Sequence, residues 1–307
     1  MRHATHGRPT RRSRVADQVE IREVSVVIPA MNAEELIGQQ LDALCAQTDP
    51  RLVEIIVADN GSQDQTPLIV SRAAESDPRV RLVMADSRPG PSFARNEGTK
   101  ASRGDLVLYC DADDVVADGW VRAMVDSAHD AELVGGRIDH HLLNPPDVSR
   151  WRGGGQSSEF QVPLRFLPFS SSANLAIHRA AWEDLGGFDD SLPFGEDVDL
   201  SWRAQLRGYR LAFAQDAVVQ YRHRHDVKSM SRQAKNYAEG EALLYQKFRV
   251  HGARRRSFRV VFKRYIYLLT RLPYLCLGES RRGLWFVVYS DLVGHLVGSV
   301  RHRVFCP

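Results

Sequence analysis

Three carboxylates stand together at the end of an apolar run in the stretch VLYCDADDVV: Asp111, Asp113 and Asp114. Like charges this close repel one another, and burying one without a partner is costly. Because side chains alternate along an extended chain, Asp111 and Asp113 should face one side and Asp114 the other. Carboxylate oxygens suit Mg²⁺ or Mn²⁺, and Mg²⁺ usually binds one or two carboxylates together with phosphates. We therefore expect a divalent ion that Asp111 and Asp113 face together; a solvated turn is the alternative.

A second acidic pair, Glu196 and Asp197, lies in LPFGEDVDLSWRAQLRGYR. Gly195 predicts a turn before a helix, and Gly208 predicts the helix end. Carboxylates at this position also have a simple structural explanation, because they interact favourably with the helix dipole. Further along, VVQYRHRHDVKS holds His223 and His225 among basic side chains. Histidines on a basic surface loop are usually solvated.

The elements that would position these groups follow from short apolar runs rich in β-branched residues. Strands are expected at Val24–Ala30, Arg79–Ala85 and Asp105–Asp114, and within Leu52–Ser62, where the strand ends in Asp59 and a turn follows. Helical segments are expected between them. Asn32 and Glu35 match a capping box before the first helix. This alternation predicts an α/β domain with a mostly parallel sheet. Ligands bind beyond the carboxyl ends of such strands, so Asp59 and the Asp111–Asp114 group should line one crevice.

The net charge of +3 is unevenly distributed along the 307 residues. Six Arg and two acidic residues give +4 over residues 1–22, and thirteen Lys or Arg and two acidic residues give +11 over 247–307, which leaves −12 between. Basic ends on an acidic body indicate an anionic partner surface. The negative net charge of residues 23–246 disfavours a nucleic-acid groove there, and no nucleic-acid recognition module is apparent. Four widely spaced cysteines predict no disulfide framework and favour a reducing compartment.

Three regions are expected: a disordered basic leader at 1–22, the α/β domain at 23–230, and a helical extension at 231–307. In the extension, the apolar segments Phe258–Leu277 and Leu284–Val300 are interrupted by charge, so neither offers the roughly 20 consecutive apolar residues of a bilayer span. Amphipathic helices at an anionic membrane surface are favoured. Packing on the sheet or on a second subunit, as in a homodimer, is the alternative. The Gly-rich stretch 144–163 is expected to be a loop, either a lid or an insertion.

Four segments in order resemble family 2 of the glycosyltransferases, the inverting enzymes of the nucleotide-diphospho-sugar (GT-A) fold. They are VSVVIPAMNAEELI, EIIVADNGSQDQT, GPSFARNEGTKASRGDLVLYCDADD and GGFDDSLPFGEDVDLSWRAQLRGY. The second segment departs from the family pattern, because Asn60 stands where a second Asp is usual. The resemblance implies a single GT-A domain, Rossmann-like with a mixed and mostly parallel sheet, followed by the helical extension.

The resemblance also implies roles for individual residues. Asp197 would be the catalytic base and Glu196 would support the acceptor site. Asp113 would hold the metal, with His225 or His223 as a further contact to metal or phosphate; Arg222, Arg224 and Lys228 could grip the diphosphate instead. The nucleotide-sugar would be bordered by Pro29, Ala30, Glu34, Asp59, Arg95 and Asp111, of which Asp59 would contact the base and Asp111 the ribose.

The implied activity is metal-dependent, inverting transfer of one sugar from a nucleotide-diphospho-sugar to the hydroxyl of a sugar, lipid-linked or small-molecule acceptor. Inversion needs one carboxylate to accept the acceptor hydroxyl's proton. The chain lacks the Gln-x-x-Arg-Trp signature of the processive synthases, because QLRGY follows the acidic helix, which favours single-sugar transfer. A cytoplasmic location, peripheral at the inner face of the plasma membrane, is expected. The alternatives are a sugar-nucleotide nucleotidyltransferase, disfavoured by the absence of Gly in PAMNAEE, or a non-catalytic glycan-assembly partner.

Overall fold

The computed structural model describes residues 20–146, 148 and 159–306. Most of the predicted leader at 1–22 and the centre of the predicted loop at 144–163 lie outside these residues.

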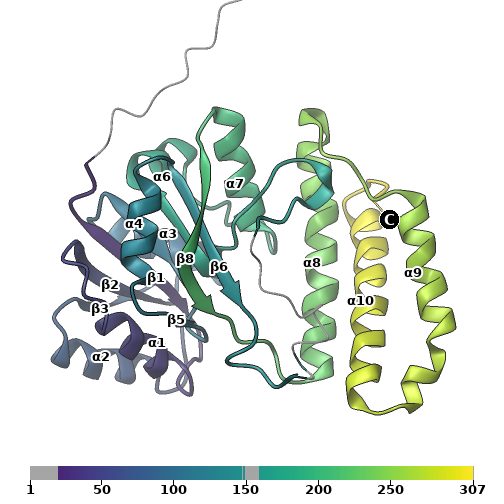
Figure 1. Cartoon of the computed structure of the whole chain (residues 1–307), viewed down its shortest axis with the longest axis horizontal. Helices are drawn as coiled ribbons and strands as arrows, with labels where there is room; N and C mark the ends of the chain where they lie inside the picture. Colours follow the sequence, from purple (N-terminus) through teal and green to yellow (C-terminus); the bar gives the residue numbers. More distant parts are fainter. Residues whose placement is uncertain (1–19, 147, 149–158, 307) are drawn as a thin grey trace, which may run out of the picture.

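The described residues form an eight-stranded sheet in the order β3-β2-β1-β4-β7-β6-β8-β5 (Figure 1). β1 pairs in parallel with β2 and β4, β2 with β3, and β6 with β8, whereas β7 runs antiparallel to β4 and β6, and β5 antiparallel to β8. The mixed, mostly parallel α/β sheet is therefore confirmed. The strands are β1 Val24–Ala30, β2 Leu52–Asp59, β3 Val80–Met84, β4 Leu106–Tyr109, β5 Val115–Val116, β6 Leu133–Asp139, β7 Leu175–His178 and β8 Leu211–Gln220.

The strand order reverses at β1, since the chain moves outward to β2 and β3 on one side and then returns to place β4 on the other. Such a reversal opens a crevice at the carboxyl ends of the strands, because the neighbouring connections diverge there. The groups after β1, β2 and β4 lie at that edge, as the sequence predicts.

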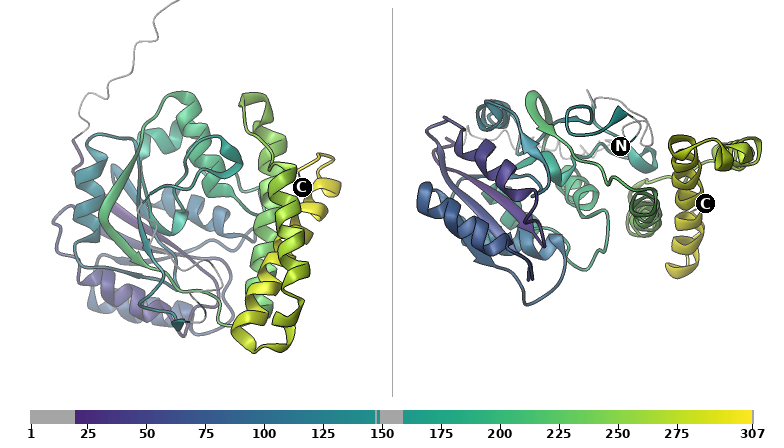
Figure 2. Two further views of the ribbon diagram at one scale, coloured as in Figure 1. Left: turned by 45° about the vertical axis from the view of Figure 1, so that its right-hand side comes forward. Right: turned by 90° about the horizontal axis from the view of Figure 1, so that it is seen from below.

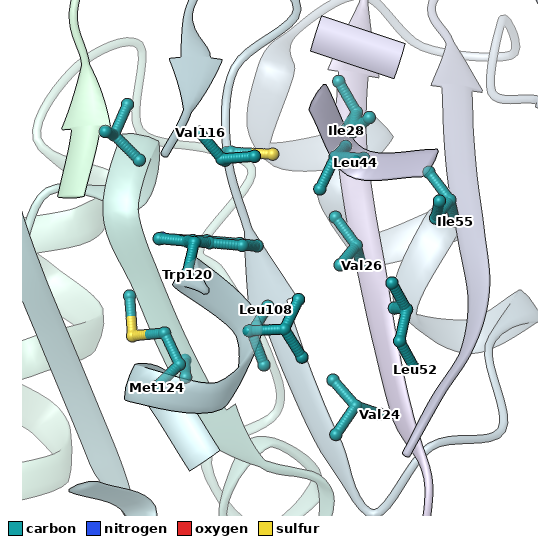
Figure 3. Packing of buried hydrophobic residues seen from close by; sticks show 14 of the residues in the cluster. Val24, Val26, Ile28, Leu44, Leu52, Ile55, Leu108, Val116, Trp120 and Met124 are labelled. Carbon is teal, nitrogen blue, oxygen red and sulfur yellow. The ribbon is translucent and has the colours of Figure 1, made fainter. Parts of the chain in front are cut away.

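Helices cover both faces of the sheet. Buried residues of α1, α2 and α4 pack on the face that carries Val26 and Leu108, whereas α6 and α7 pack on the face that carries Val27 and Tyr109. The first core is continuous from the β2 side to Trp120 and Met124 of α4 (Figure 3). The helices of the domain are α1 Ile37–Cys45, α2 Thr66–Ser76, α3 Pro91–Ala101, α4 Trp120–Ala128, α6 Arg179–Leu185 and α7 Glu196–Arg207, with short 3-10 turns η1 Pro163–Arg165 and η2 Ser172–Asn174.

The helical extension is attached to the domain through α7. α8 (Val227–Phe248) packs against Val198 and Trp202 of α7, α10 (Glu279–Arg301) packs against α8, and α9 (Phe258–Thr270) lies outermost (Figures 1 and 2). The 3-10 turns η3 Arg249–His251 and η4 Leu272–Cys276 flank α9. The predicted domain boundary at 230/231 falls inside α8, and the division itself stays a prediction.

Candidate active site

The first part of the site lies where β1 and β2 end side by side. Pro29 pairs with Ala58 and Ala30 with Asp59 in the parallel ladder. Asp59 is fully buried; its Oδ2 accepts a hydrogen bond from the Ser62 N–H at 3.0 Å. Its Oδ1 has no hydrogen-bond partner among the described residues. A buried carboxylate oxygen without a donor is costly, so this atom fits the predicted contact with an N–H of a nucleotide base.

Asn60 has a structural explanation for its departure from the family pattern. Its Nδ2 donates hydrogen bonds to the carbonyls of Ala85 and, at 2.8 Å, Arg88, while its Oδ1 accepts from the Gly90 N–H at 2.7 Å. An aspartate carboxylate cannot donate to those carbonyls. Asn60 therefore ties the end of β2 to the segment that leads into α3.

Glu34 lies at the same edge but uses its carboxylate within the protein. Its Oε2 accepts a hydrogen bond from the Gln65 N–H at 2.8 Å, and its own N–H donates to Asp64 at 3.0 Å. The side chain thus joins the turn after β1 to the start of α2. A contact between Glu34 and a nucleotide stays a prediction.

The acidic group at Asp111, Asp113 and Asp114 differs from its predicted local structure. β4 ends at Tyr109, and residues 111–114 form a turn, so strand alternation does not apply to them. The turn gathers all three side chains, with one carboxylate oxygen of each within 4.8 Å of the others. The expectation that Asp114 points away from Asp113 is therefore wrong. The predicted closeness of Asp111 and Asp113 holds, but through a turn and not through an extended chain.

Gln40 holds this turn in place, and the sequence reasoning missed it. Its Nε2 donates to the Asp111 carbonyl at 3.1 Å and its Oε1 accepts from the Val116 N–H at 3.0 Å. Gln40 is fully buried on α1. The signal that could have found it is a polar residue on the apolar stripe formed by Ile37, Leu41 and Leu44.

The electrostatics of the acidic group call for a cation. Burial, together with the charges of its two neighbours, raises the pKa of the Asp114 carboxyl well above its usual range, and burial and Asp111 raise the pKa of Asp113. Arg224 offsets part of this, with Nη1 3.5 Å from Asp113 Oδ2, and the Arg222 N–H donates to Asp114 Oδ1 at 2.8 Å. Asp114 Oδ2 is buried and has no hydrogen-bond partner among the described residues. Three converging carboxylates with an unpartnered oxygen fit Mg²⁺ or Mn²⁺.

The two predicted histidines lie in different surroundings. His223 is buried, its ring stacks on His140 at 4.8 Å, and its N–H donates to Asn144 Oδ1 at 2.7 Å. His225 is exposed. Arg224, which lies between them in the sequence, has its Nη1 3.5 Å from Asp113 Oδ2. The roles of Arg224 and of either histidine at the metal or the diphosphate stay predictions.

The Glu196–Asp197 pair opens α7, as predicted from Gly195. Asp197 Oδ1 accepts a hydrogen bond from the Val198 N–H at 2.8 Å, and the Ser172 N–H also lowers the pKa of Asp197. Burial and the neighbouring Glu196 charge outweigh these donors and raise the pKa of Asp197 to about 7. A carboxylate with this pKa is suited to take up and release a proton near neutral pH.

Arg95 joins the two acidic groups. Its guanidinium, on a side chain only 4% exposed, donates from Nη2 to Asp111 Oδ1 at 2.8 Å and from Nη1 to Glu196 Oε1 at 3.0 Å. One buried side chain thus bridges the group after β4 and the pair that opens α7. The sequence predicted Arg95 near the donor but not this bridge, because the two partners are far apart along the chain.

The comparisons with known proteins bear on the family of the chain and on its fold. The Glycosyl transferase family 2 model matches residues 25–186, and the Glycosyl transferase family group 2 model matches residues 106–301. Glycosyltransferase AglE of Haloferax volcanii is 30% identical over 198 residues, which are 64% of this chain and 65% of AglE. The chain therefore spans slightly less than two thirds of that relative.

Two solved structures have the same fold. One is the mannosyltransferase PcManGT of Pyrobaculum calidifontis in complex with GDP-Man and Mn²⁺. It has a TM-score of 0.60 at 20% identity, and the match covers 91% of this chain and 88% of the PcManGT chain. S. aureus TarS 1–349, in complex with UDP-GlcNAc, has a TM-score of 0.53 at 18% identity, with 92% of both chains covered. The family model spans more than half of the chain, and this protein therefore belongs to glycosyl transferase family 2.

Proposed function

We propose that the protein is a metal-dependent, inverting glycosyltransferase of the hexosyltransferase type, which moves one sugar from a nucleotide-diphospho-sugar to an acceptor hydroxyl. The observation that carries the proposal is the Arg95 bridge. Arg95 contacts Asp111 of the three-carboxylate group and Glu196, the neighbour of Asp197, whose pKa is raised. A donor held by the first group would have its anomeric carbon directed toward the second, which is the arrangement that transfer requires.

On the donor side, the unpartnered Oδ1 of Asp59 would accept a hydrogen bond from the base, with Pro29 and Ala30 beside it. Asp111 would contact the ribose. Asp113 would hold the ion, with Asp114 close enough to share it. A bound Mg²⁺ or Mn²⁺ would neutralise the charge that develops on the leaving nucleoside diphosphate. Arg224 would assist from the other side of the diphosphate.

On the acceptor side, Asp197 would take the proton of the attacking hydroxyl. The Val198 N–H and the Ser172 N–H would hold the carboxylate in place while it does so. Glu196 keeps the pKa of Asp197 high and is itself held by Arg95. A single base on the face opposite the leaving group gives inversion of the anomeric configuration, because the attacking oxygen enters from that face.

Cell-envelope, glycolipid or secondary-metabolite glycans are the products we propose, made at the cytoplasmic face of the plasma membrane. The support is the family, whose structural relatives bind GDP-Man or UDP-GlcNAc, and the basic composition of residues 247–307. The acceptor would be a sugar, a lipid-linked or a small-molecule hydroxyl. A homodimer through the extension is the alternative use of the same helices.

The proposal is tested by incubating the purified chain with UDP-, GDP- and dTDP-sugars and a panel of acceptors, with Mn²⁺ or with EDTA. We expect release of nucleoside diphosphate that EDTA abolishes and that Asp113→Asn lowers strongly. Asp118→Asn is the matched control, because Asp118 lies on the same segment outside the acidic group. Release of pyrophosphate from nucleoside triphosphate and sugar phosphate would favour a nucleotidyltransferase, and no turnover with any donor would favour a non-catalytic partner.

A further inference from the structure

The α9–α10 hairpin is the part of the molecule that the glycosyl-transfer site does not explain. It stands at the edge of the molecule and reaches the domain through α8 (Figures 1 and 2). By length and composition, α10, a helix of 23 residues, is the one helix in the described part of the chain that could cross a membrane. The expectation that its apolar segment is too short for a span is therefore not upheld by this measure. What surrounds α10 decides how the hairpin is used.

α10 is docked closely on α8. A Cβ on Gly298 would lie 2.8 Å from Ala242 Cβ and 3.0 Å from the Glu239 carbonyl, and one on Gly294 would collide with the Lys235 carbonyl. Small residues spaced four apart let two helices approach in this way. This close approach at Gly294 and Gly298 indicates that α10 is a packed helix of this protein and that α8 holds it.

Two polar side chains in the middle of α10, Asp291 and His295, are paired with groups on α8, on α9 and on the segment before α9. Arg256 contacts Asp291 at 2.8 Å and Glu241 at 2.7 Å, Arg264 of α9 also pairs with Asp291, and His295 lies 3.1 Å from Glu241. Moving α10 alone into a bilayer would break these pairs and leave Asp291 in hydrocarbon, which is costly. The structure therefore favours a hairpin that lies at a membrane surface over an α10 that spans the membrane.

The outer face of α9 has the composition of an interfacial helix. Phe258, Phe262, Ile266 and Leu269 recur at helical spacing and are exposed, and the first two line an open hollow together with Val261 and Tyr265. An apolar stripe of this kind on a basic helix is typical of segments that lie in the boundary of a bilayer.

The turn between α9 and α10 combines apolar and basic groups. Leu272 and Leu277 are half exposed, Arg271 stacks over Tyr267 at 4.7 Å, and both Arg271 and Arg281 lie 5.7 Å from the Tyr274 ring. Aromatic rings with arginines are enriched at the headgroup level of membranes. Residues 247–307 carry thirteen Lys or Arg against two acidic residues, so the complementary surface is an anionic one.

This turn lies at the same end of the molecule as the carboxyl ends of β6 and β8 and the start of α8 (Figures 1 and 2). The acidic group belongs to that end, because Arg222 and Arg224, which follow β8, contact it. We propose that the hairpin tip, residues 271–282, and the outer face of α9 sit in an anionic bilayer surface and turn the transfer site toward the headgroups, so that the acceptor is carried on a membrane lipid. This inference rests on the proposed glycosyl transfer.

The binding half is tested by flotation of the full chain with phosphatidylcholine vesicles, with or without phosphatidylglycerol, at roughly 0.1 M salt. We expect flotation that depends on phosphatidylglycerol and is reversed by high salt or carbonate. Leu272→Glu with Leu277→Glu should weaken it roughly tenfold or more. The matched control, Leu68→Glu with Val250→Glu, places two glutamates at exposed apolar positions away from the tip and should float as the wild type does.

Three results would overturn the binding half. Equal flotation without phosphatidylglycerol and resistance to carbonate would mean that α10 spans the bilayer. A dimer that the tip pair dissociates, with no flotation, would mean that a second copy covers the hairpin. Failure to float in every condition would remove the membrane altogether.

The acceptor half is tested by comparing long-chain alkyl glycosides embedded in anionic vesicles with methyl glycosides of the same sugars in solution. We expect the embedded acceptors to react at least roughly tenfold faster, and the tip pair to lose that advantage while keeping its rate on methyl glycosides. Equal rates on both forms would overturn the lipid assignment. If no acceptor of either form supports nucleoside diphosphate release, that result would instead refute the glycosyl transfer, whatever the flotation shows.

Discussion

At the residue scale, Arg95 is the side chain that makes one site of two acidic groups. Burying a guanidinium is costly, and here two carboxylates offset the cost by direct hydrogen bonds. Its charge also lowers the pKa of Asp197, against the effect of burial and Glu196. The bridge therefore couples the position of the donor carboxylates to the protonation of the proposed base.

Asp197→Asn removes the proposed base with little change in shape. We expect the rate of transfer to fall by roughly 10²- to 10⁴-fold, which is the usual contribution of a positioned general base. Binding of the sugar nucleotide, measured by calorimetry with Mn²⁺, should change little, because Asp197 lies on the acceptor side. Loss of donor binding would show that Asp197 has been given the wrong role.

The raised pKa of Asp197 also predicts how stability and activity change with pH. The base is active when ionised, so kcat/KM should rise as pH increases through about 7. The folded state holds the proton more tightly than the unfolded state, whose carboxyl has the ordinary value of 3.8. Stability is therefore lost as pH rises from about 4 to 7. Asp197→Asn lacks this loss, so the Tm of the variant should rise relative to the wild-type Tm as pH increases over that range. A Tm difference that stays constant with pH would contradict the raised pKa of Asp197.

Two variants of Arg95 separate its charge from its geometry. Arg95→Gln removes a charge that lowers the pKa of Asp197, so the ascending limb of the pH–kcat profile should move to higher pH. Arg95→Lys keeps the charge but cannot reproduce the bridge to both Asp111 and Glu196, so the limb should stay while kcat falls. Arg72→Gln on the exposed face of α2 is the control. If the ascending limb of the pH–kcat profile lies at the same pH in the wild type and in all three variants, the role of Arg95 is structural only.

At the element scale, the strands were predictable and the turns were only partly so. Continuous apolar runs placed the first three strands close to their observed bounds, and β1 agrees with its predicted ends. The capping box at Asn32 is wrong, because α1 begins at Ile37 and Asn32 Oδ1 accepts from the Gln63 N–H at 2.8 Å instead. The contact to Gln63 and the Gln40 contacts to the acidic turn join segments distant in sequence, which local patterns do not reveal.

Asn60→Asp tests the turn that leads from β2 to α3. The substitution restores the usual family residue but replaces the Nδ2 donor by a carboxylate facing the carbonyls of Ala85 and Arg88. We expect a loss of about 1–3 kcal/mol in the free energy of unfolding, measured by denaturant titration. Asp86→Asn, at an exposed position of the segment between β3 and α3, serves as a comparison. An unchanged stability of Asn60→Asp would mean that the turn adapts.

At the scale of the whole molecule, the strand order positions the proposed transfer site, and the uneven charge distribution sets the surface proposed to meet the membrane. The reversal at β1 gathers Asp59, the acidic group and Arg95 at one edge, and the helical extension brings the basic and apolar surface to the same end. The family resemblance predicted the α/β domain and named the residues that are proposed to form its site. It did not predict that α10 would be packed on α8 through Gly294 and Gly298, since the same apolar segment is compatible with a helix at a membrane surface, on the sheet or on a second subunit.

The stereochemistry of the product tests the proposed single-displacement transfer most directly. Proton NMR of the glycoside formed from an α-linked sugar nucleotide, with Mn²⁺ present, should show the β anomer as the initial product, and Asp197→Asn should form it roughly 10²- to 10⁴-fold more slowly. A retained α anomer, or undiminished transfer by Asp197→Asn, would contradict a single displacement assisted by Asp197.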